Sequence, residues 1–408
     1  MWLKSLKVLN NSLIVINNKL LKTIDDKDEF FFNINQINKS YEVLIDHRKK
    51  QQVNDLIEWA NLEKLPKYEY ITDDRGSYWY GFPRDIDKLM DLKELNLNSC
   101  NISYIPTDIK LLVNLEKLIL TNNNLRVLPK EITSLIKLEY LALGHNNLEK
   151  LPDSIGNLNK LKFLWVQNNK LYSLPDSLNY LDNLEKISLN NNYIRDFSFK
   201  LKNCIYLNID NNYIQTLLMN SSLNNLEFLS LNNNNIKELS VIYNFYNLKE
   251  LSLFNNNIKI ISSEIKNLKK LEFLEFGKNE LKDLPDNIKK LDDLRQLSLM
   301  NNKLNIFPIE IISLKNLEEL NIGYNKINII PDNISELAEL KVFCLQENSL
   351  TYISEEITKL IKLKELRFSD SYFSNKKSEK YQFTDTHLEW IQYLKTKNCV
   401  IYGLQFNL

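Results

Sequence analysis

The chain has 408 residues, a length that suits two or three ordinary domains or one elongated domain built from repeats. It contains 72 Leu and 58 Asn but only 7 Gly, and so few glycines argue against most nucleotide enzymes, whose phosphate loops need several. Lys and Arg balance Asp and Glu at 52 each, so we expect neither nucleic acid nor a membrane as a partner.

Residues 1–49 form an N-terminal extension whose apolar runs are short. We expect these runs to be strands of a small β-rich unit. No run is long enough for a signal peptide or a membrane span, and the four cysteines are scattered without CxxC spacing. These features predict a cytoplasmic protein. The expected strands are Ser12–Ile16, Phe30–Ile34 and Tyr41–Ile45.

Residues 50–91 form a flank ahead of the repeats. Within it, Gln51–Leu62 is expected to be an amphipathic helix that could lie over the exposed core edge of the first repeat. Its apolar residues follow i, i+3, i+4, i+7 spacing: Val53, Leu56, Ile57 and Ala60.

Residues 92–373 consist of thirteen copies of one unit, LxxLxLxxNxLxxLPxxIxxLxx. The LxL segment alternates with period two, which predicts a short strand with one buried face. Strands of successive copies would stack in parallel and share one continuous core. The copies begin at Leu92, Leu115, Leu138, Leu161, Leu184, Cys204, Leu226, Leu248, Leu271, Leu294, Leu317, Leu340 and Leu363.

This unit resembles the leucine-rich repeat family, in its 23-residue LPxxIxxL class. The resemblance implies an α/β solenoid: a curved horseshoe with a parallel concave β-sheet and an irregular or short-helical convex side. The segments IEWANLEKLP and GFPRDIDKLMDLKELNL are similar to the N-terminal flank of small bacterial members of the family.

The ninth residue is Asn in eleven of the thirteen copies. Where the strand turns into the core, backbone groups lose their sheet partners, and a side-chain amide can both donate to and accept from them. We therefore interpret this column as structural, and we expect the neighbouring Asn211 and Asn233 to lie at a solvent-facing rim where Ala is tolerated. The column is Asn123, Asn146, Asn169, Asn192, Asn212, Asn234, Asn256, Asn279, Asn302, Asn325 and Asn348.

The convex half changes in the middle of the array. Proline occurs in seven copies but is missing from the fifth to the eighth, and the fifth copy has only 20 residues. Because strand and Asn register are kept, the shortening falls on the convex side, and we expect a local change of curvature between Leu184 and Asn247. Neutral decay of the repeat is the alternative.

Residues 374–408 are expected to cap the last repeat. Thr386–Lys395 has helical spacing of its apolar residues, and Cys399–Tyr402 predicts a short strand. Between them and the array, Asn375–Lys380 is charged and is expected to be a loop.

The sequence lacks the common catalytic and cofactor motifs, including GxxxxGK[ST], GxGxxG, GxSxG and HExxH. The three histidines are scattered and do not suggest a metal site. We therefore expect no enzyme activity, no cofactor and no metal.

The residues between the leucines of each strand should point outward on the concave face, where large apolar groups gather in the third to seventh copies. Exposed aromatics on such a surface are candidate binding anchors. The candidate partner-binding residues are Tyr140, His145, Phe163, Trp165, Lys186, Tyr206 and Phe228, with Phe254 and Phe273 close by.

These features favour a monomeric, non-catalytic scaffold or adaptor that binds a protein of unknown identity on its concave face. The alternative is a secreted or injected bacterial effector that uses the same face on a host protein.

Overall fold

The computed structural model describes residues 27–74, 76–217, 223–368 and 385–402. The chain divides into two compact units, Met1–Trp59 and Ala60–Leu408. The second unit contains the repeats and the elements that flank them.

Helix α2 spans Lys27–Leu62. It includes the helix expected from residue 51 to 62, and Val53, Leu56 and Ala60 are buried. The strands predicted at Phe30–Ile34 and Tyr41–Ile45 are wrong, because both segments lie inside α2. The strand predicted at Ser12–Ile16 lies outside the described residues.

A hairpin and a short helix connect α2 to the array. The hairpin pairs β1 (Glu69–Asp73) with β2 (Gly76–Tyr80), and its tyrosine Tyr80 donates a 3.0 Å hydrogen bond to the carbonyl of Asn98 in the first copy. Helix α3 (Ile86–Met90) is capped at its N-terminus by Asp85, whose side chain accepts a hydrogen bond from the Lys88 N–H.

Arg84 ties this flank together. Its guanidinium donates to the side-chain oxygen of Asn61 and to the carbonyls of Ala60, Leu65 and Phe82, at 2.5 to 3.1 Å. These acceptors belong to the end of α2 and to the loops around the hairpin. The guanidinium, a planar group with several donors, therefore holds these segments together.

We expect Arg84→Met to lower the free energy of unfolding by about 2 kcal/mol, because the variant leaves carbonyls without their charged donor. Chemical denaturation monitored by circular dichroism measures this change. Arg126→Met, at an exposed arginine, is the control and should leave the midpoint unchanged. Equal midpoints for the two variants would contradict the role given to Arg84.

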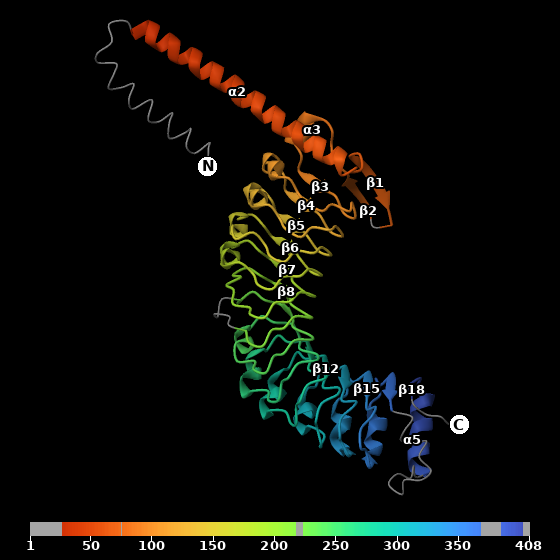
Figure 1. The fold of residues 1–408 in the computed structure, drawn as a ribbon. Coiled ribbons are helices and arrows are strands. Elements are labelled where there is room, and N and C mark those ends of the chain that lie inside the picture. Colours follow the sequence, from red (N-terminus) through yellow and green to blue (C-terminus); the bar gives the residue numbers. More distant parts are fainter. Residues whose placement is uncertain (1–26, 75, 218–222, 369–384, 403–408) are drawn as a thin grey trace. The chain divides into compact units, whose positions relative to one another are not determined.

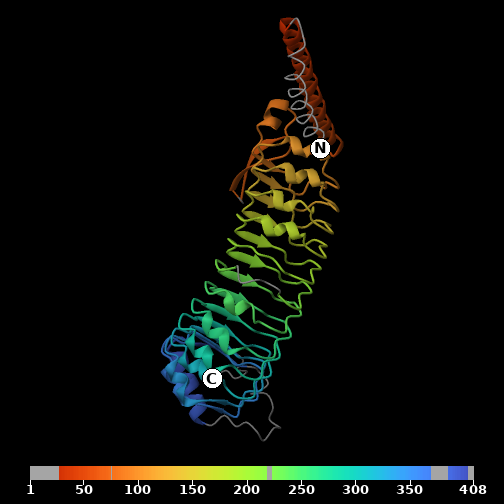
Figure 2. The ribbon, with the colours of Figure 1, turned by 90° about the vertical axis from the view of Figure 1, so that its left-hand side faces the viewer.

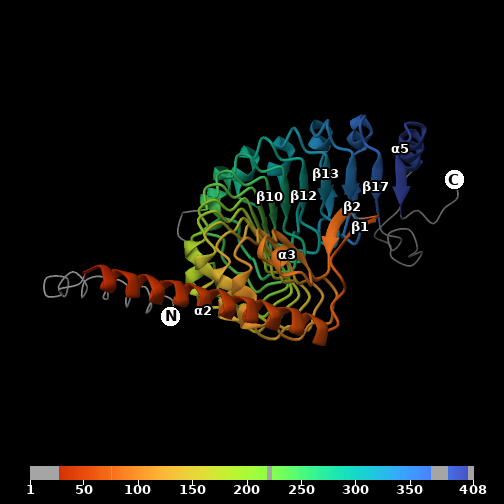
Figure 3. The ribbon, with the colours of Figure 1, turned by 90° about the horizontal axis from the view of Figure 1, so that it is seen from above.

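The thirteen repeats and the C-terminal strand form a 14-stranded parallel sheet, and this confirms the predicted solenoid (Figures 1 and 3). In each strand from the repeats the central residue is buried while its neighbours project outward, as the LxL pattern predicts. The strands, in sheet order, are β3 (Glu94–Asn96), β4 (Lys117–Ile119), β5 (Tyr140–Ala142), β6 (Phe163–Trp165), β7 (Lys186–Ser188), β8 (Tyr206–Asn208), β9 (Phe228–Ser230), β10 (Glu250–Ser252), β11 (Phe273–Glu275), β12 (Gln296–Ser298), β13 (Glu319–Asn321), β15 (Val342–Cys344), β17 (Glu365–Arg367) and β18 (Val400–Tyr402).

Short 3-10 turns line the convex side of the array (Figure 2). Most begin directly after a proline of the LP motif, whose fixed φ suits the entry to a turn. They are η1 (Thr107–Leu111), η2 (Lys130–Ser134), η3 (Ile155–Asn157), η4 (Asp176–Tyr180), η5 (Ile242–Asn244), η6 (Ser263–Asn267), η7 (Asp286–Lys290), η8 (Ile309–Ser313), η9 (Asp332–Glu336) and η10 (Glu355–Lys359), with a two-stranded sheet of β14 (Ile329–Ile330) and β16 (Tyr352–Ile353).

The shortened copies keep the sheet register but change the convex side. Strands β7, β8 and β9 pair without a break in register. The fifth copy has no 3-10 turn among its described residues, and Phe197 instead forms an isolated parallel bridge with Leu217. The expected change of curvature remains a prediction.

The C-terminal helix and strand both form. Helix α5 spans Asp385–Thr396, and β18 extends the main sheet beside β17. The Trp390 ring of α5 lies 6.4 Å from the Phe368 ring, so α5 contacts the last copy. The loop expected at Asn375–Lys380 lies outside the described residues.

Candidate binding face on the concave sheet

The concave face brings five aromatic side chains together on β5, β6, β8 and β9. The sheet register aligns Tyr140, Phe163, Lys186, Tyr206 and Phe228 in one row across neighbouring strands, whereas Trp165 stands in the next row. All six side chains are half-buried. We call Tyr140, Phe163, Trp165, Tyr206 and Phe228 the aromatic band.

Ring contacts join members of the band. Tyr140 and Phe163 lie with their ring centres 5.9 Å apart, and Tyr206 stacks on Phe228 at 4.4 Å. Trp165 meets Tyr206 edge-on at 6.2 Å although β7 lies between their strands. The small side chain of Ser188 on β7 leaves room for this contact. The rings therefore support one another before any partner binds.

Polar groups at one end of the band act on Tyr140. Burial raises the pKa of its hydroxyl, and Lys117 and the indole N–H of Trp165 partly offset this rise. The Lys117 ammonium lies 5.6 Å from the centre of the Tyr140 ring. The buried indole nitrogen of Trp165 forms no hydrogen bond with a described residue. It therefore acts on the pKa of Tyr140 as a nearby dipole.

The two polar candidates occupy different positions. Lys186 lies in the row of the band and forms no ion pair with a described residue. His145 lies exposed in the loop after β5, and its Nε2 atom is 3.2 Å from the Asn168 amide nitrogen of the next copy. The ring of His145 therefore lies beside the loop that follows β6 in the next copy.

Two carboxylates on the same face were missed by the sequence analysis. Asp210 follows β8 and Glu275 ends β11, and burial raises the pKa of both. Phe254 lies two residues after β10 and Phe273 begins β11, and both are half-buried. Asp210 is the seventh residue of its copy, two positions after the outward-facing fifth residue. Continuing the outward-facing rows to the seventh residue would have identified it from the sequence.

The structural asparagines form a continuous ladder. Each side-chain oxygen accepts from a backbone N–H of the preceding copy, and each amide donates to carbonyls of both copies. For Asn146 the acceptors are the carbonyls of Leu120 and Leu143 at 2.9 and 3.0 Å, and the donor is the Leu125 N–H at 3.0 Å. All eleven members of the column are buried.

The residue before each ladder asparagine has a left-handed backbone. Asn211 and Asn233 both have φ of 54°, and His145 has φ of 56°. Asn adopts this region more readily than other residues with a Cβ. The expectation that Ala is tolerated at Asn211 and Asn233 therefore needs correction, because Ala is strained there.

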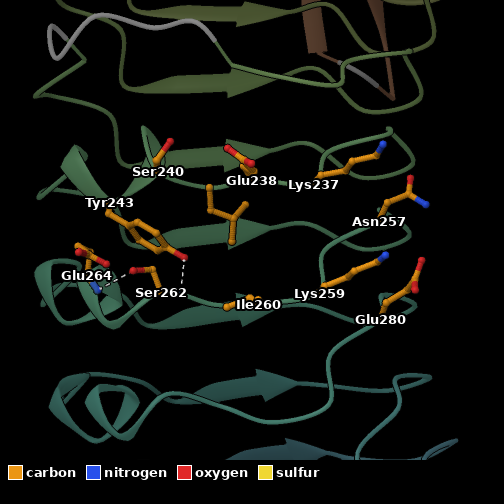
Figure 4. A pocket seen from close by; sticks show the side chains of 11 residues that line it. Lys237, Glu238, Ser240, Tyr243, Asn257, Lys259, Ile260, Ser262, Glu264 and Glu280 are labelled. Atoms are coloured by element: carbon orange, nitrogen blue, oxygen red, sulfur yellow. Dashed lines mark hydrogen bonds between the residues drawn. The ribbon is translucent and has the colours of Figure 1, made fainter.

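A groove of about 660 Å³ lies on the side of the array between the seventh and eighth copies (Figure 4). Lys237, Lys259 and Glu280 line one end, and Tyr243 lies toward the other. The Tyr243 hydroxyl accepts a 2.9 Å hydrogen bond from the Ser262 N–H, and burial raises its pKa to about 12. The lining mixes lysines and glutamates, so it selects no single charge.

The described residues hold no cluster of three or more His, Cys, Asp or Glu side chains that could bind a metal ion. None of their helices has the length and apolar character needed to cross a membrane. The four cysteines are free thiols, and burial raises the pKa of Cys204 to about 12.

Comparison with known proteins identifies the repeat. The leucine-rich repeat region profile matches residues 81–189 and 111–209, and the leucine-rich repeat profile matches residues 247–268 and 316–337. A leucine-rich repeat protein of Leptospira interrogans is 30% identical, with a TM-score of 0.67 over 77% of this chain and 84% of that chain. The chain belongs to the leucine-rich repeat family. No curated protein matches its sequence.

Two further solved structures share the solenoid. An internalin of Listeria monocytogenes matches with a TM-score of 0.67 at 21% identity, over 79% of this chain and 89% of that chain, and shows the fold alone. The plant peptide hormone receptor RGFR1, solved in complex with RGF2, matches with a TM-score of 0.55 at 26% identity. The match covers 74% of this chain and 55% of the receptor chain. Leucine-rich repeat domains typically bind proteins or peptides.

Proposed function

We propose that this leucine-rich repeat protein is a non-catalytic scaffold or adaptor that binds a protein segment on its concave face. The aromatic band is the observation that carries the proposal. Five large rings gather on one open sheet face, and each is already held by ring contacts or the sheet. Rings held in this way offer contact area at a small further cost in side-chain entropy.

Affinity capture from the producing cells, followed by mass spectrometry, tests the proposal. We expect the double variant Tyr206→Ala, Phe228→Ala to lose proteins that the wild type captures, because it removes the stacked pair at 4.4 Å. Tyr180→Ala is the control, since Tyr180 is a 71% exposed aromatic on the convex turn η4. Captured proteins that respond only to Tyr180→Ala would place binding on the convex side.

The cytoplasm is the compartment that we propose. Cys204, Cys344 and Cys399 are buried free thiols, which suits a reducing environment. The alternative, a secreted or injected effector, would use the same concave face. Fractionation of cells and medium distinguishes an effector from a cytoplasmic scaffold. Recovery of the protein in the medium of intact cells would favour the effector.

A further inference from the structure

The concave face is acidic from β8, where it overlaps the end of the aromatic band, to β13. The third, fifth and seventh residues of the copies that contain β8 to β13 project on this face, and all are described. Four of them are acidic and none is basic. The acidic residues are Asp210, Glu250, Glu275 and Glu319.

Charged residues just before the strands, in contrast, form ion pairs with one another. Lys249 pairs with Glu227 at 2.9 Å, and Glu318 pairs with both Arg295 and Lys341. The four concave carboxylates form no ion pair with any described residue. Their negative charge is therefore open to a partner, while that of the paired residues before the strands is neutralised within the protein.

Glu275 and Phe254 occupy the space above a glycine. A Cβ atom on Gly277 would lie 2.6 Å from a carboxylate oxygen of Glu275 and 2.9 Å from the Phe254 ring. The same carboxylate accepts a hydrogen bond from the Gly277 N–H. Gly277 thus lets a fixed carboxylate and an aromatic ring stand side by side on the open face.

Asp210 is held in a second fixed arrangement. Its carboxylate accepts from the Ser230 hydroxyl and the Asn232 N–H, both at 2.6 Å. The side-chain oxygen of Asn232 in turn accepts from the Ser252 hydroxyl and the Phe254 N–H, both at 2.7 Å. This chain of hydrogen bonds runs from β8 to the end of β10 and holds the carboxylate in place without a counter-charge.

We propose that this acidic aromatic strip, formed by Asp210, Glu250, Phe254, Phe273 and Glu275, receives Lys or Arg side chains from a basic segment of the partner. The proposal rests on the concave face being the binding face. A cationic head group would gain from half-buried carboxylates and from the faces of aromatic rings together.

Other occupants fit the strip less well. An apolar segment would cover carboxylates without neutralising them, which costs free energy. An acidic segment would meet like charge. A metal ion lacks a suitable cluster of ligands among the described residues. The complementary charge therefore arrives on a side chain.

Selection from a displayed library of random peptides tests the proposal with defined probes. We expect peptides that bind the wild type to be enriched in Lys or Arg and to bind more weakly as salt is added. Glu275→Gln should weaken them about tenfold. Glu310→Gln, on the convex turn η8, removes the same charge and should leave their affinity unchanged.

Folding of the variants is checked by thermal melts. Glutamine retains an acceptor for the Gly277 N–H, so Glu275→Gln should fold. Glu250→Gln is a second variant at an exposed carboxylate on β10, and it should also weaken the basic peptides.

The possible outcomes separate this proposal from the proposed function. Peptides that require Tyr206 and Phe228 but lack basic residues, or that bind Glu275→Gln and Glu250→Gln as tightly as the wild type, overturn the basic segment alone. Two outcomes overturn both proposals. One is that the selected peptides bind every concave-face variant as tightly as the wild type, and the other is that no peptide is selected.

Discussion

Replacing Asn212 by Ala is expected to lower the free energy of unfolding by about 3 kcal/mol, because several buried backbone groups lose their partner at once. The Asn212 oxygen accepts from the Ile194 N–H at 3.0 Å, and its amide donates to the carbonyls of Leu189 and Ile209 at 3.1 Å. The side chain is 4% exposed, so water does not replace these bonds. Urea denaturation monitored by circular dichroism gives the loss.

The neighbouring Asn211 provides the matched control. Asn211 is exposed with φ of 54°, a conformation that glycine adopts freely. Asn211→Gly should therefore unfold within about 0.5 kcal/mol of the wild type. Asn211→Ala should cost about 1 kcal/mol, because Ala lacks the short polar side chain through which Asn tolerates the left-handed region. If Asn212→Ala and Asn211→Gly gave the same midpoint, the ladder would not stabilise the array as we infer.

The fold was predictable because each copy repeats one local environment. A single LxL segment is ambiguous, but the register of Leu207, Leu229 and Leu251 follows from thirteen copies read together. Helix α2 had no such repetition. Its short apolar runs suggested strands, although Phe30, Ile34, Ile37, Tyr41 and Leu44 are spaced by four and three residues, the helical period.

The candidate site was predictable in its rows and less so in its contacts. Strand register placed Tyr140 next to Phe163, as the structure shows at 5.9 Å. The contact of Trp165 with Tyr206 across β7 depends on side-chain rotamers and on the small Ser188, which a repeat pattern does not specify. The degree of burial of each ring likewise depends on side-chain rotamers, which the repeat pattern does not specify.

The double variant Phe163→Ala, Trp165→Ala is expected to weaken binding of a captured partner by at least thirtyfold. Truncation of an interface anchor typically costs about 2 kcal/mol or more, which corresponds to this factor. Phe163 and Trp165 stand two residues apart on β6, so both project from the same face of the sheet. Isothermal titration calorimetry with the purified partner measures the change.

Stability must be measured on the same samples, because both rings are half-buried in the free protein. Loss of the contacts with Tyr140 and Tyr206 should lower the free energy of unfolding by about 1 kcal/mol for each ring pair. Tyr180→Ala, at a 71% exposed aromatic of the same copy outside the sheet, is the control for both measurements. Unchanged affinity in the double variant would move the binding site off this part of the face. A collapse of the melting temperature would show instead that the two rings belong to the core, because anchors for a partner can be removed while the solenoid stays folded.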